Sequence, residues 1–391
     1  MKGNHMRFTL IIPILHYPPV IGGIEVFVQN IAQRLSQDMD IRIITGRVAG
    51  TPTRETDGRL HIDRTASLYP LSNLSYSSYW YVLTALPILF FQTVRAVRKT
   101  SRPLLHANGF FSGIVCMCVS FFTHVPYVIT IQSADFTIYH PEARFLVRLQ
   151  MAVERAVYRR ARVCHAVSND LCKHFRNQGV STCVMIPNGV ETDVFKPLDE
   201  AGKRRVRETY KVPLDAKLVV TTSRLEHKNG VQDLIAAVAK IPDAHLIVAG
   251  DGSRRVSLEA LAREHGIKQR VTFLGHVLHE KVGELVASAD VYARTPLSEG
   301  FGIVFLEAMA AGVPVVATPV GGIPDFLEDG VTGVFARAGD PDSIAQALSK
   351  ILSDETLRLS LIKNGAERIA TTYNWDTIAR RVNEEVFASA V

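Results

Sequence analysis

Two glutamates, Glu299 and Glu307, flank a Gly-x-Gly turn in the stretch SEGFGIVFLEAMAAGVPVV (residues 298–316). If a helix begins in the glycine segment and ends near Gly312, Glu299 lies at the N-terminus of this helix and Glu307 lies about one to two turns into it. The first N–H groups of such a helix lack intrahelical acceptors and attract an anion. Carboxylates in turn accept hydrogen bonds from sugar and ribose hydroxyls. The pattern therefore predicts a site for a sugar and a ribose joined through phosphate.

The surroundings of these acids decide between a ligand site and ordinary surface charge. An isolated pair of glutamates at a helix start would most often face solvent. Here the acids lie in a largely apolar stretch that follows a strand-like run, DVYARTP. An acid in buried surroundings needs polar partners, and this favours the ligand site. The phosphate would lie on the backbone amides of the glycine segment, which are those of Gly300, Phe301, Gly302 and Ile303.

Two cations, Arg224 and Lys228, follow the strand-like run KLVVTTSR. Ligands of open α/β sheets bind at the carboxyl ends of the strands. An arginine fork and a lysine point charge placed there can neutralise a diphosphate. Such a pair can also be ordinary surface charge. Because it follows a buried strand, a diphosphate site and surface charge explain it equally well.

Paired glycines, Gly22 and Gly23, come after the first strand-like run, RFTLIIPIL, and before an amphipathic helix. They would let backbone amides approach a ligand closely, although a tight turn between strand and helix explains them equally well. Two Asp-x-Asp pairs, at 38–40 and 340–342, fit a helix-end loop and a helix start better than a metal site. We therefore expect no metal.

The order of elements indicates a parallel α/β protein. Strand-like runs alternate with helical ones along the chain, which is the βα repeat of sheets covered on both faces. The pattern restarts after a Pro-Asn-Gly sequence at 187–189, where regular structure breaks. We predict two doubly wound, Rossmann-like domains facing a cleft, an N-terminal domain 1–186 and a second domain 187–375. A final helix, 376–391, is expected to pack back on the first domain.

Composition and charge are those of a soluble globular protein with a basic first half. The chain has 391 residues, of which 47% are hydrophobic, and a formal net charge of +6. Residues 1–190 hold 20 Lys and Arg against 10 Asp and Glu, and the remainder holds 24 against 28. Two apolar stretches, 79–94 and 110–122, are shorter than the ~20 residues of a spanning helix. They fit buried crossover helices, or an interfacial surface beside Arg95 and Lys99 for an anionic membrane.

These motifs together resemble glycosyltransferase family four, the retaining enzymes of the GT-B fold. The resemblance covers nearly the whole chain and includes VMIPNGVETDVFKP at the domain boundary, RVTFLGHV, PVVATPVGG and a closing WDTIARRV helix. It implies that Arg224 and Lys228 hold the donor diphosphate and that Glu307 takes the ribose hydroxyls. Glu299, with the amides after it, would hold the transferred sugar.

The resemblance also assigns roles in the first domain. It implies that Gly22 and Gly23 approach the phosphate or the acceptor. Many members have a histidine after the strand that here reads VITI, whereas this chain has Gln132, which can hydrogen-bond a sugar hydroxyl but cannot relay a proton at neutral pH. The interval from Arg224 to Lys228 is also shorter than in many members.

The resemblance therefore implies transfer of a hexosyl unit from a UDP- or GDP-sugar to a glycan or lipid-linked acceptor. Such a reaction belongs to the synthesis of cell-surface polysaccharides or glycolipids. The nucleotide sugar is a co-substrate, and neither a metal nor a nucleic acid is expected as a partner. The alternatives are a sugar-nucleotide epimerase or phosphorylase of the same plan, and a non-catalytic nucleotide-sugar-binding protein. Five cysteines without ligand spacing favour reduced thiols in the cytoplasm, and the first residues show no secretory signal. Attachment would be peripheral, on the inner face of the membrane.

Overall fold

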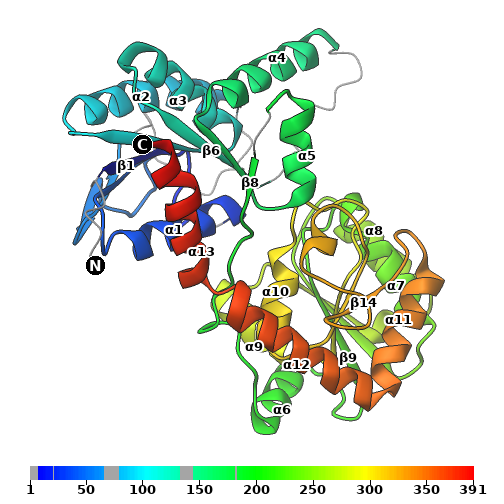
Figure 1. Cartoon of the computed structure of the whole chain (residues 1–391). Helices are drawn as coiled ribbons and strands as arrows, with labels where there is room; N and C mark the ends of the chain where they lie inside the picture. The colour runs from blue at the N-terminus through cyan, green and yellow to red at the C-terminus, as the bar shows by residue number, and fades with distance from the viewer. Residues whose placement is uncertain (1–7, 21, 66–78, 133–143, 181–182) are drawn as a thin grey trace. The chain divides into compact units, whose positions relative to one another are not determined.

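The fold is that of two α/β units (Figure 1). A computed structural model describes all residues except 1–7, 21, 66–78, 133–143 and 181–182. The chain divides into unit 1, Met1–Pro187 with Trp375–Val391, and unit 2, Asn188–Asn374. The prediction of an α/β fold with two Rossmann-like sheets is confirmed.

Unit 1 has, within its described residues, an eight-stranded sheet in the order β3-β4-β2-β1-β5-β6-β7-β8. The strands are β1 Thr9–Pro13, β2 Ile41–Thr45, β3 Arg54–Asp57, β4 Leu60–Arg64, β5 Pro103–Asn108, β6 Tyr127–Ile131, β7 Val163–Ala166 and β8 Cys183–Met185. The helices are α1 Gly23–Leu35, α2 Tyr79–Arg98, α3 Gly109–Thr123, α4 Arg144–Arg160, α5 Asn169–Asn177 and α13 Trp375–Arg381. Among these strands β3 alone runs antiparallel to its neighbour. Helices cover the apolar central strands, so that β6, for example, is buried along its whole length.

Unit 2 has a six-stranded parallel sheet in the order β11-β10-β9-β12-β13-β14. Its strands are β9 Lys217–Thr222, β10 Ala244–Ala249, β11 Val271–Gly275, β12 Val291–Arg294, β13 Val315–Ala317 and β14 Val334–Phe335. Its helices are α6 Glu200–Thr209, α7 Val231–Ala239, α8 Arg255–Glu264, α9 His279–Ala287, α10 Ile303–Ala310, α11 Pro341–Ser353 and α12 Glu355–Thr372. Since β9 lies beside β12, the loops that follow these two strands leave the sheet next to each other.

The segment from Trp375 onwards belongs to unit 1. Figure 1 shows α13, in red, beside α1, in blue. The Trp375 ring lies 6.1 Å from that of Phe27 between centroids, and Phe387 lies 4.9 Å from His106. Both Trp375 and Phe387 are buried. The segment therefore completes the hydrophobic core of unit 1.

The two apolar stretches form helices α2 and α3 in unit 1. Helix α3 connects β5 to β6, which pair in parallel, and it buries Val115 and Val119. Within the described residues, none of the helices combines the length and the apolar character that crossing a bilayer would need. Helix α3 is therefore a crossover helix between parallel strands, and its buried side chains pack inside unit 1.

Two of the five cysteines depart from the expectation of reduced thiols. Cys172 in α5 and Cys183 in β8 form a disulfide, whereas Cys116, Cys118 and Cys164 are free. The expectation was wrong for the disulfide pair because α5 and β8 pack together, a proximity that cysteine spacing along the sequence does not reveal.

Candidate functional site

Glu299 lies in the loop between β12 and α10 and is held from two sides. Arg294, at the end of β12, donates a hydrogen bond from its guanidinium to Glu299 Oε2. The other oxygen, Oε1, accepts from the backbone N–H of Gly300 at 2.9 Å. The two side chains are only 12% and 18% exposed. A carboxylate keeps further lone pairs when each oxygen has one partner, so Glu299 is fixed in place and can still accept bonds from a ligand.

Arg294 also joins this loop to the one that follows β9. Its Nη2 donates to Asn229 Oδ1 at 3.0 Å, and Asn229 Nδ2 donates to the carbonyl of Arg224 at 2.6 Å. Asn229 is buried. Glu299 and the Arg224 backbone are therefore connected through one network of side chains, which fixes the geometry of both loops.

The two predicted cations lie in that loop after β9. The Arg224 side chain is exposed, and Lys228 is half-buried in a single 3₁₀ turn, His227–Asn229. The Lys228 carbonyl accepts from the N–H of Leu297, in the loop after β12, at 2.7 Å. The structure thus brings the Arg224 loop and the Glu299 loop together at the carboxyl edge of adjacent strands.

Helix α10, Ile303–Ala310, begins where the glycine segment predicts. Its N-cap is Gly302, with φ at +87°, a left-handed conformation that favours glycine. A Cβ there would also lie 2.8 Å from the Phe305 ring. Of the four predicted phosphate-binding amides, that of Gly300 already donates to Glu299. The amides of Phe301 and Gly302 come directly before α10, and that of Ile303 belongs to its first turn, where helix N–H groups lack intrahelical acceptors.

Gly321, in the loop after β13, supports the backbone of Glu299. Its φ is +57°, and a Cβ at this position would lie 1.6 Å from the carbonyl oxygen of Glu299. No side chain fits at that distance, so the loop after β13 touches the Glu299 loop only because residue 321 is glycine.

Glu307 lies in α10, and the charged side chains that act on it are those of His279, Glu191 and Arg294. Burial raises the pKa of its carboxyl to about 7, and these nearby charges modify this shift. His279 Nε2 lies 3.3 Å from Glu191 Oε2, and this hydrogen bond raises the pKa of His279. Glu307 is therefore a carboxyl whose charge changes near neutral pH.

The remaining predicted residues lie in unit 1, at the carboxyl ends of β1 and β6. Gly22 caps α1 in an extended conformation, and a Cβ there would lie 2.6 Å from Glu25 Oε2. A Cβ on Gly23 would meet only Gln132 Oε1, at 3.7 Å. Gln132 Nε2 is buried without a hydrogen-bond partner in the part of the chain that the structure describes. These three residues form one group at this edge of unit 1.

A small cavity of about 160 Å³ opens beside the start of α1. It is lined by Glu25, Asn108 and Phe110, among others. Asn108 is only 5% exposed. Both of its side-chain polar atoms are buried and find no hydrogen-bond partner among the described residues. Burial raises the pKa of Glu25. A buried amide without partners is costly, so this cavity suits a ligand with hydroxyl groups.

Sequence reasoning missed four residues of the site: Asn229, Arg294, His279 and Glu191. Arg294 had a readable signal, because a charged residue at the carboxyl end of a buried strand faces the ligand edge of the sheet. Nothing in the local sequence links His279 to Glu191, which lie far apart in the chain and meet only through the fold. Within the described residues no group of three or more His, Cys, Asp or Glu side chains could hold a metal ion.

Both halves of the chain match family models of glycosyltransferases. Residues 202–368 match Glycosyl transferases group 1, and residues 21–194 match Glycosyltransferase Family 4. An uncharacterized glycosyltransferase of Methanocaldococcus jannaschii is 28% identical over 93% of this chain and 94% of its own length. A GDP-mannose-dependent alpha-(1-6)-phosphatidylinositol monomannoside mannosyltransferase of Mycobacterium tuberculosis is 34% identical over 50% of this chain and 54% of its own.

Solved structures agree on the fold. Sucrose-phosphate synthase from Thermosynechococcus elongatus aligns with a TM-score of 0.82 at 24% identity, covering 98% of this chain and 100% of the other. Anabaena HepE in complex with UDP and glucose aligns with a TM-score of 0.77 at 21% identity, covering 98% and 100%. Because the two family matches together span most of the sequence, the chain belongs to the family-four, group 1 glycosyltransferases.

Proposed function

We propose that this glycosyltransferase moves a hexosyl unit from a UDP- or GDP-sugar, with retention at the anomeric carbon, to a glycan or lipid-linked acceptor. The observation that carries the proposal is the meeting of two loops at adjacent strands. Arg224 and Lys228 follow β9, and Glu299 with the start of α10 follows β12. Cations, helix amides and a fixed carboxylate at one sheet edge match a diphosphate joined to a sugar.

Each group has a role in this proposal. Arg224 and Lys228 neutralise the diphosphate, with the amides of Phe301, Gly302 and Ile303. Glu299, held by Arg294, accepts hydrogen bonds from the transferred sugar. Glu307 accepts them from the ribose. Gly22 and Gly23 approach the phosphate or the acceptor, and Gln132 hydrogen-bonds a sugar hydroxyl.

The transfer step needs electrostatic stabilisation more than a protein nucleophile. The bond between the anomeric carbon and the diphosphate oxygen breaks while the acceptor oxygen bonds to the same face of that carbon. The acceptor hydroxyl proton passes to the departing diphosphate. Charge therefore develops on the diphosphate, where preorganised cations and amides contribute most, and they can do so without a divalent ion.

Relatives support the substrate classes. One is named as a GDP-mannose-dependent phosphatidylinositol monomannoside mannosyltransferase, and several are named D-inositol 3-phosphate glycosyltransferase. HepE was also crystallised with UDP-glucose. A nucleotide-sugar donor and a polyol or lipid-linked acceptor are consistent with these names. We assign the acceptor to unit 1, where the cavity beside Asn108 offers unpaired polar atoms to hydroxyl groups.

The direct test is a screen of UDP- and GDP-sugars by thermal shift, because a bound donor raises the unfolding temperature. The donor that binds is then tested for turnover with candidate acceptors, in the presence of excess EDTA. Steady product formation in EDTA with the α-anomer from an α-donor supports the proposal. Binding without turnover would indicate a non-catalytic protein, and activity that returns only with Mg²⁺ or Mn²⁺ would overturn the metal-free assignment.

Donor affinity should rise between pH 6 and pH 8. The pKa of Glu307 is raised to about 7, so its carboxyl is mostly protonated at pH 6 and ionised at pH 8. The ionised form accepts stronger hydrogen bonds from ribose hydroxyls, which gives a rise of up to about tenfold. The intact nucleotide sugar is the ligand, measured by calorimetry. Glu307→Gln should bind more weakly with a flat profile, and His279→Gln should move the rise to higher pH, because the charge of His279 lowers the pKa of Glu307. A rise that persists in Glu307→Gln would refute this role.

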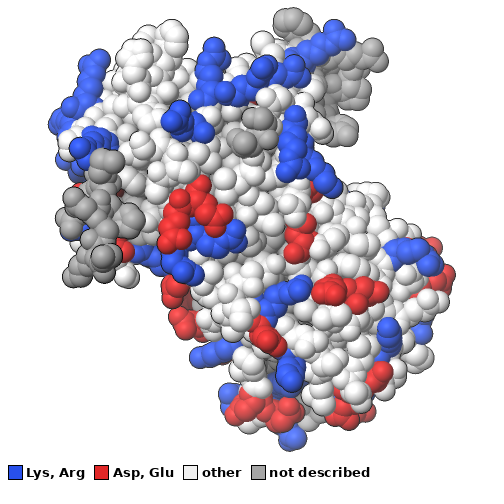
Figure 2. All heavy atoms as spheres, viewed as in Figure 1, with Lys and Arg blue, Asp and Glu red and all other residues white. Residues whose placement is uncertain are grey.

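Peripheral attachment to the cytoplasmic leaflet is the second part of the proposal. Phe91 in α2 and Phe121 and Phe122 in α3 are 69%, 72% and 69% exposed, and the Phe121 and Phe122 rings contact each other. Lys and Arg also lie along α4 and α5 of the same unit (Figure 2). Exposed aromatic rings near cations suit an anionic lipid surface.

Co-sedimentation with lipid vesicles tests this attachment. Binding should increase with anionic lipid and decrease with salt, since the attraction is screened. The double variant Phe121→Ser with Phe122→Ser should release the protein. Leu359→Ser, which changes an exposed apolar residue of unit 2, is the matched control and should still bind. Binding that ignores both lipid charge and salt would contradict the assignment.

A further inference from the structure

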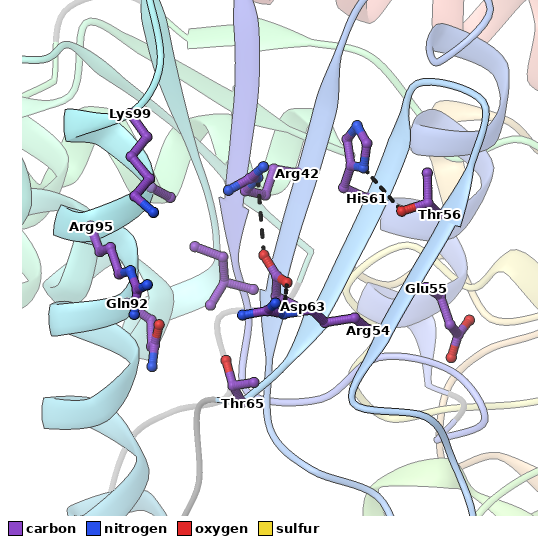
Figure 3. A pocket seen from close by; sticks show the side chains of 12 residues that line it. Arg42, Arg54, Glu55, Thr56, His61, Asp63, Thr65, Gln92, Arg95 and Lys99 are labelled. Carbon is purple, nitrogen blue, oxygen red and sulfur yellow. Dashed lines mark hydrogen bonds and ion pairs between the residues drawn. The ribbon is translucent and has the colours of Figure 1, made fainter.

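A second polar pocket lies in unit 1 between helix α2 and strands β2, β3 and β4 (Figure 3). Its volume is about 360 Å³. Four cations line it: Arg42, Arg54, Arg95 and Lys99. Figure 3 shows Arg95, on α2, and Lys99, just after it, across the pocket from Arg42 and Arg54 on the sheet. The glycosyl-transfer proposal uses none of these residues.

The carboxylates of the pocket do not balance its cations. Asp63 is shared by Arg42, at 4.0 Å, and Arg54, at 3.4 Å. Glu55, the other acid of the lining, pairs with Arg64 at 3.1 Å, which is not a lining residue. In the part of the chain that the structure describes, the side chains of Arg95 and Lys99 make no ion pair or hydrogen bond, and the backbone N–H of Lys99 donates to the carbonyl of Ala96. The pocket therefore carries an excess of positive charge.

The arrangement of the cations is unfavourable without an anion. Arg95 is in the last turn of α2 and Lys99 follows its end, so these two like charges are only four residues apart and repel each other. They also face two arginines that share a single carboxylate. Neutral polar groups complete the lining, among them the side chain of Gln92 and the Thr56 hydroxyl, 3.2 Å from His61 Nδ1. Such a lining offers several donors to one oxyanion.

We propose that this pocket binds a phosphate monoester. A monoester carries a charge of about −1.5 to −2 at pH 7 and three acceptor oxygens, which matches two unpaired cations and two half-paired ones. The volume exceeds what a phosphate group fills, so a glycerol- or sugar-sized remainder fits as well. The monoester comes either from a soluble metabolite or from a lipid headgroup.

The pocket is separate from the donor and acceptor groups of the proposed reaction. The residues that line it differ from all of those that line the cavity beside Asn108. Gly22 and Gln132 follow the carboxyl ends of β1 and β6. The exposed Phe91 lies one turn before Arg95 on α2. An apolar side chain beside an anion pocket favours the lipid-borne source.

Binding of glycerol 3-phosphate to the full chain, measured by calorimetry at low and high salt, tests the pocket. The double variant Arg95→Gln with Lys99→Gln should bind at least tenfold more weakly than the unmodified chain. Arg98→Gln is the matched control, since Arg98 is an exposed arginine of the same helix outside the pocket, and it should bind normally. All three side chains are exposed, and an unchanged unfolding temperature verifies that the variants fold. Equal affinity in the double variant, or an equal loss in Arg98→Gln, overturns the proposal.

Vesicles distinguish the two sources of the monoester. If the source is a lipid, phosphatidic acid vesicles retain the protein better than phosphatidylglycerol vesicles, whose phosphate is a diester with one charge, and the double variant loses the difference. If the source is soluble, glycerol 3-phosphate binding depends on Arg95 and Lys99 while the two kinds of vesicle bind equally. Donor turnover in the double variant should match that of the unmodified chain, which separates this pocket from the proposed transfer site.

Discussion

Replacing Arg224 by alanine should lower turnover by about a hundredfold to a thousandfold, the loss seen when one preorganised donor to a developing charge is removed. Arg224 is exposed at the carboxyl end of β9, so the loss should fall on the reaction and leave folding intact. Its backbone carbonyl, not its side chain, accepts from Asn229, and the network to Glu299 survives the change. Initial rates at saturating donor measure the effect.

The control for Arg224→Ala is Arg263→Ala, which removes an exposed arginine from α8 in the same unit. It should keep the rate and the unfolding temperature of the unmodified chain. A rate for Arg224→Ala within threefold of this control would remove Arg224 from the diphosphate site.

The second large effect is expected for Gly321→Ala. A Cβ there would lie 1.6 Å from the carbonyl oxygen of Glu299, so the backbone of Glu299 must move by more than an ångström. A displacement of that size at a reacting group costs about a hundredfold in rate. The left-handed φ of +57° adds about 1–2 kcal/mol of strain. Turnover and urea unfolding should be measured together.

Gly330→Ala separates these two contributions. Gly330 also has a left-handed φ, +71°, but open space where its Cβ would lie. The two variants should lose similar stability from backbone strain, and only Gly321→Ala should lose most of its activity. Equal activity in both variants would show that the contact with Glu299 does not matter for the reaction.

Much of unit 2 could be predicted because its signals are local. The glycine segment before Ile303 and Gly312, two residues after Ala310, fix both ends of α10, since glycine takes the left-handed conformations found at helix ends. The βα alternation then places Arg224 and Glu299 at one edge of a parallel sheet. Both steps need only neighbouring residues and the rules of the fold class.

The parts that could not be predicted depend on distant contacts. Strand β3 reads RETD and has no apolar residue, and β4 reads LHIDR with only two. These short runs carry too weak a signal, so the hairpin and the pocket that it forms with α2 were missed. The pairing of His279 with Glu191 joins residues far apart in sequence. Glu307 was assigned as a carboxylate, whereas its raised pKa follows from burial, which its own position in the sequence does not reveal.

The return of residues 375–391 to unit 1 sets the order in which the chain can fold as it leaves the ribosome. Unit 2 is continuous, Asn188–Asn374, and is complete as soon as its last helix has emerged. Unit 1 cannot complete its core until the end of the chain has been synthesised. Phe27 packs against Trp375 and His106 against Phe387, and both partners lie in this last segment. Synthesis usually favours folding of the N-terminal domain first. Here the half of the chain that is translated later is the first to have all of its residues.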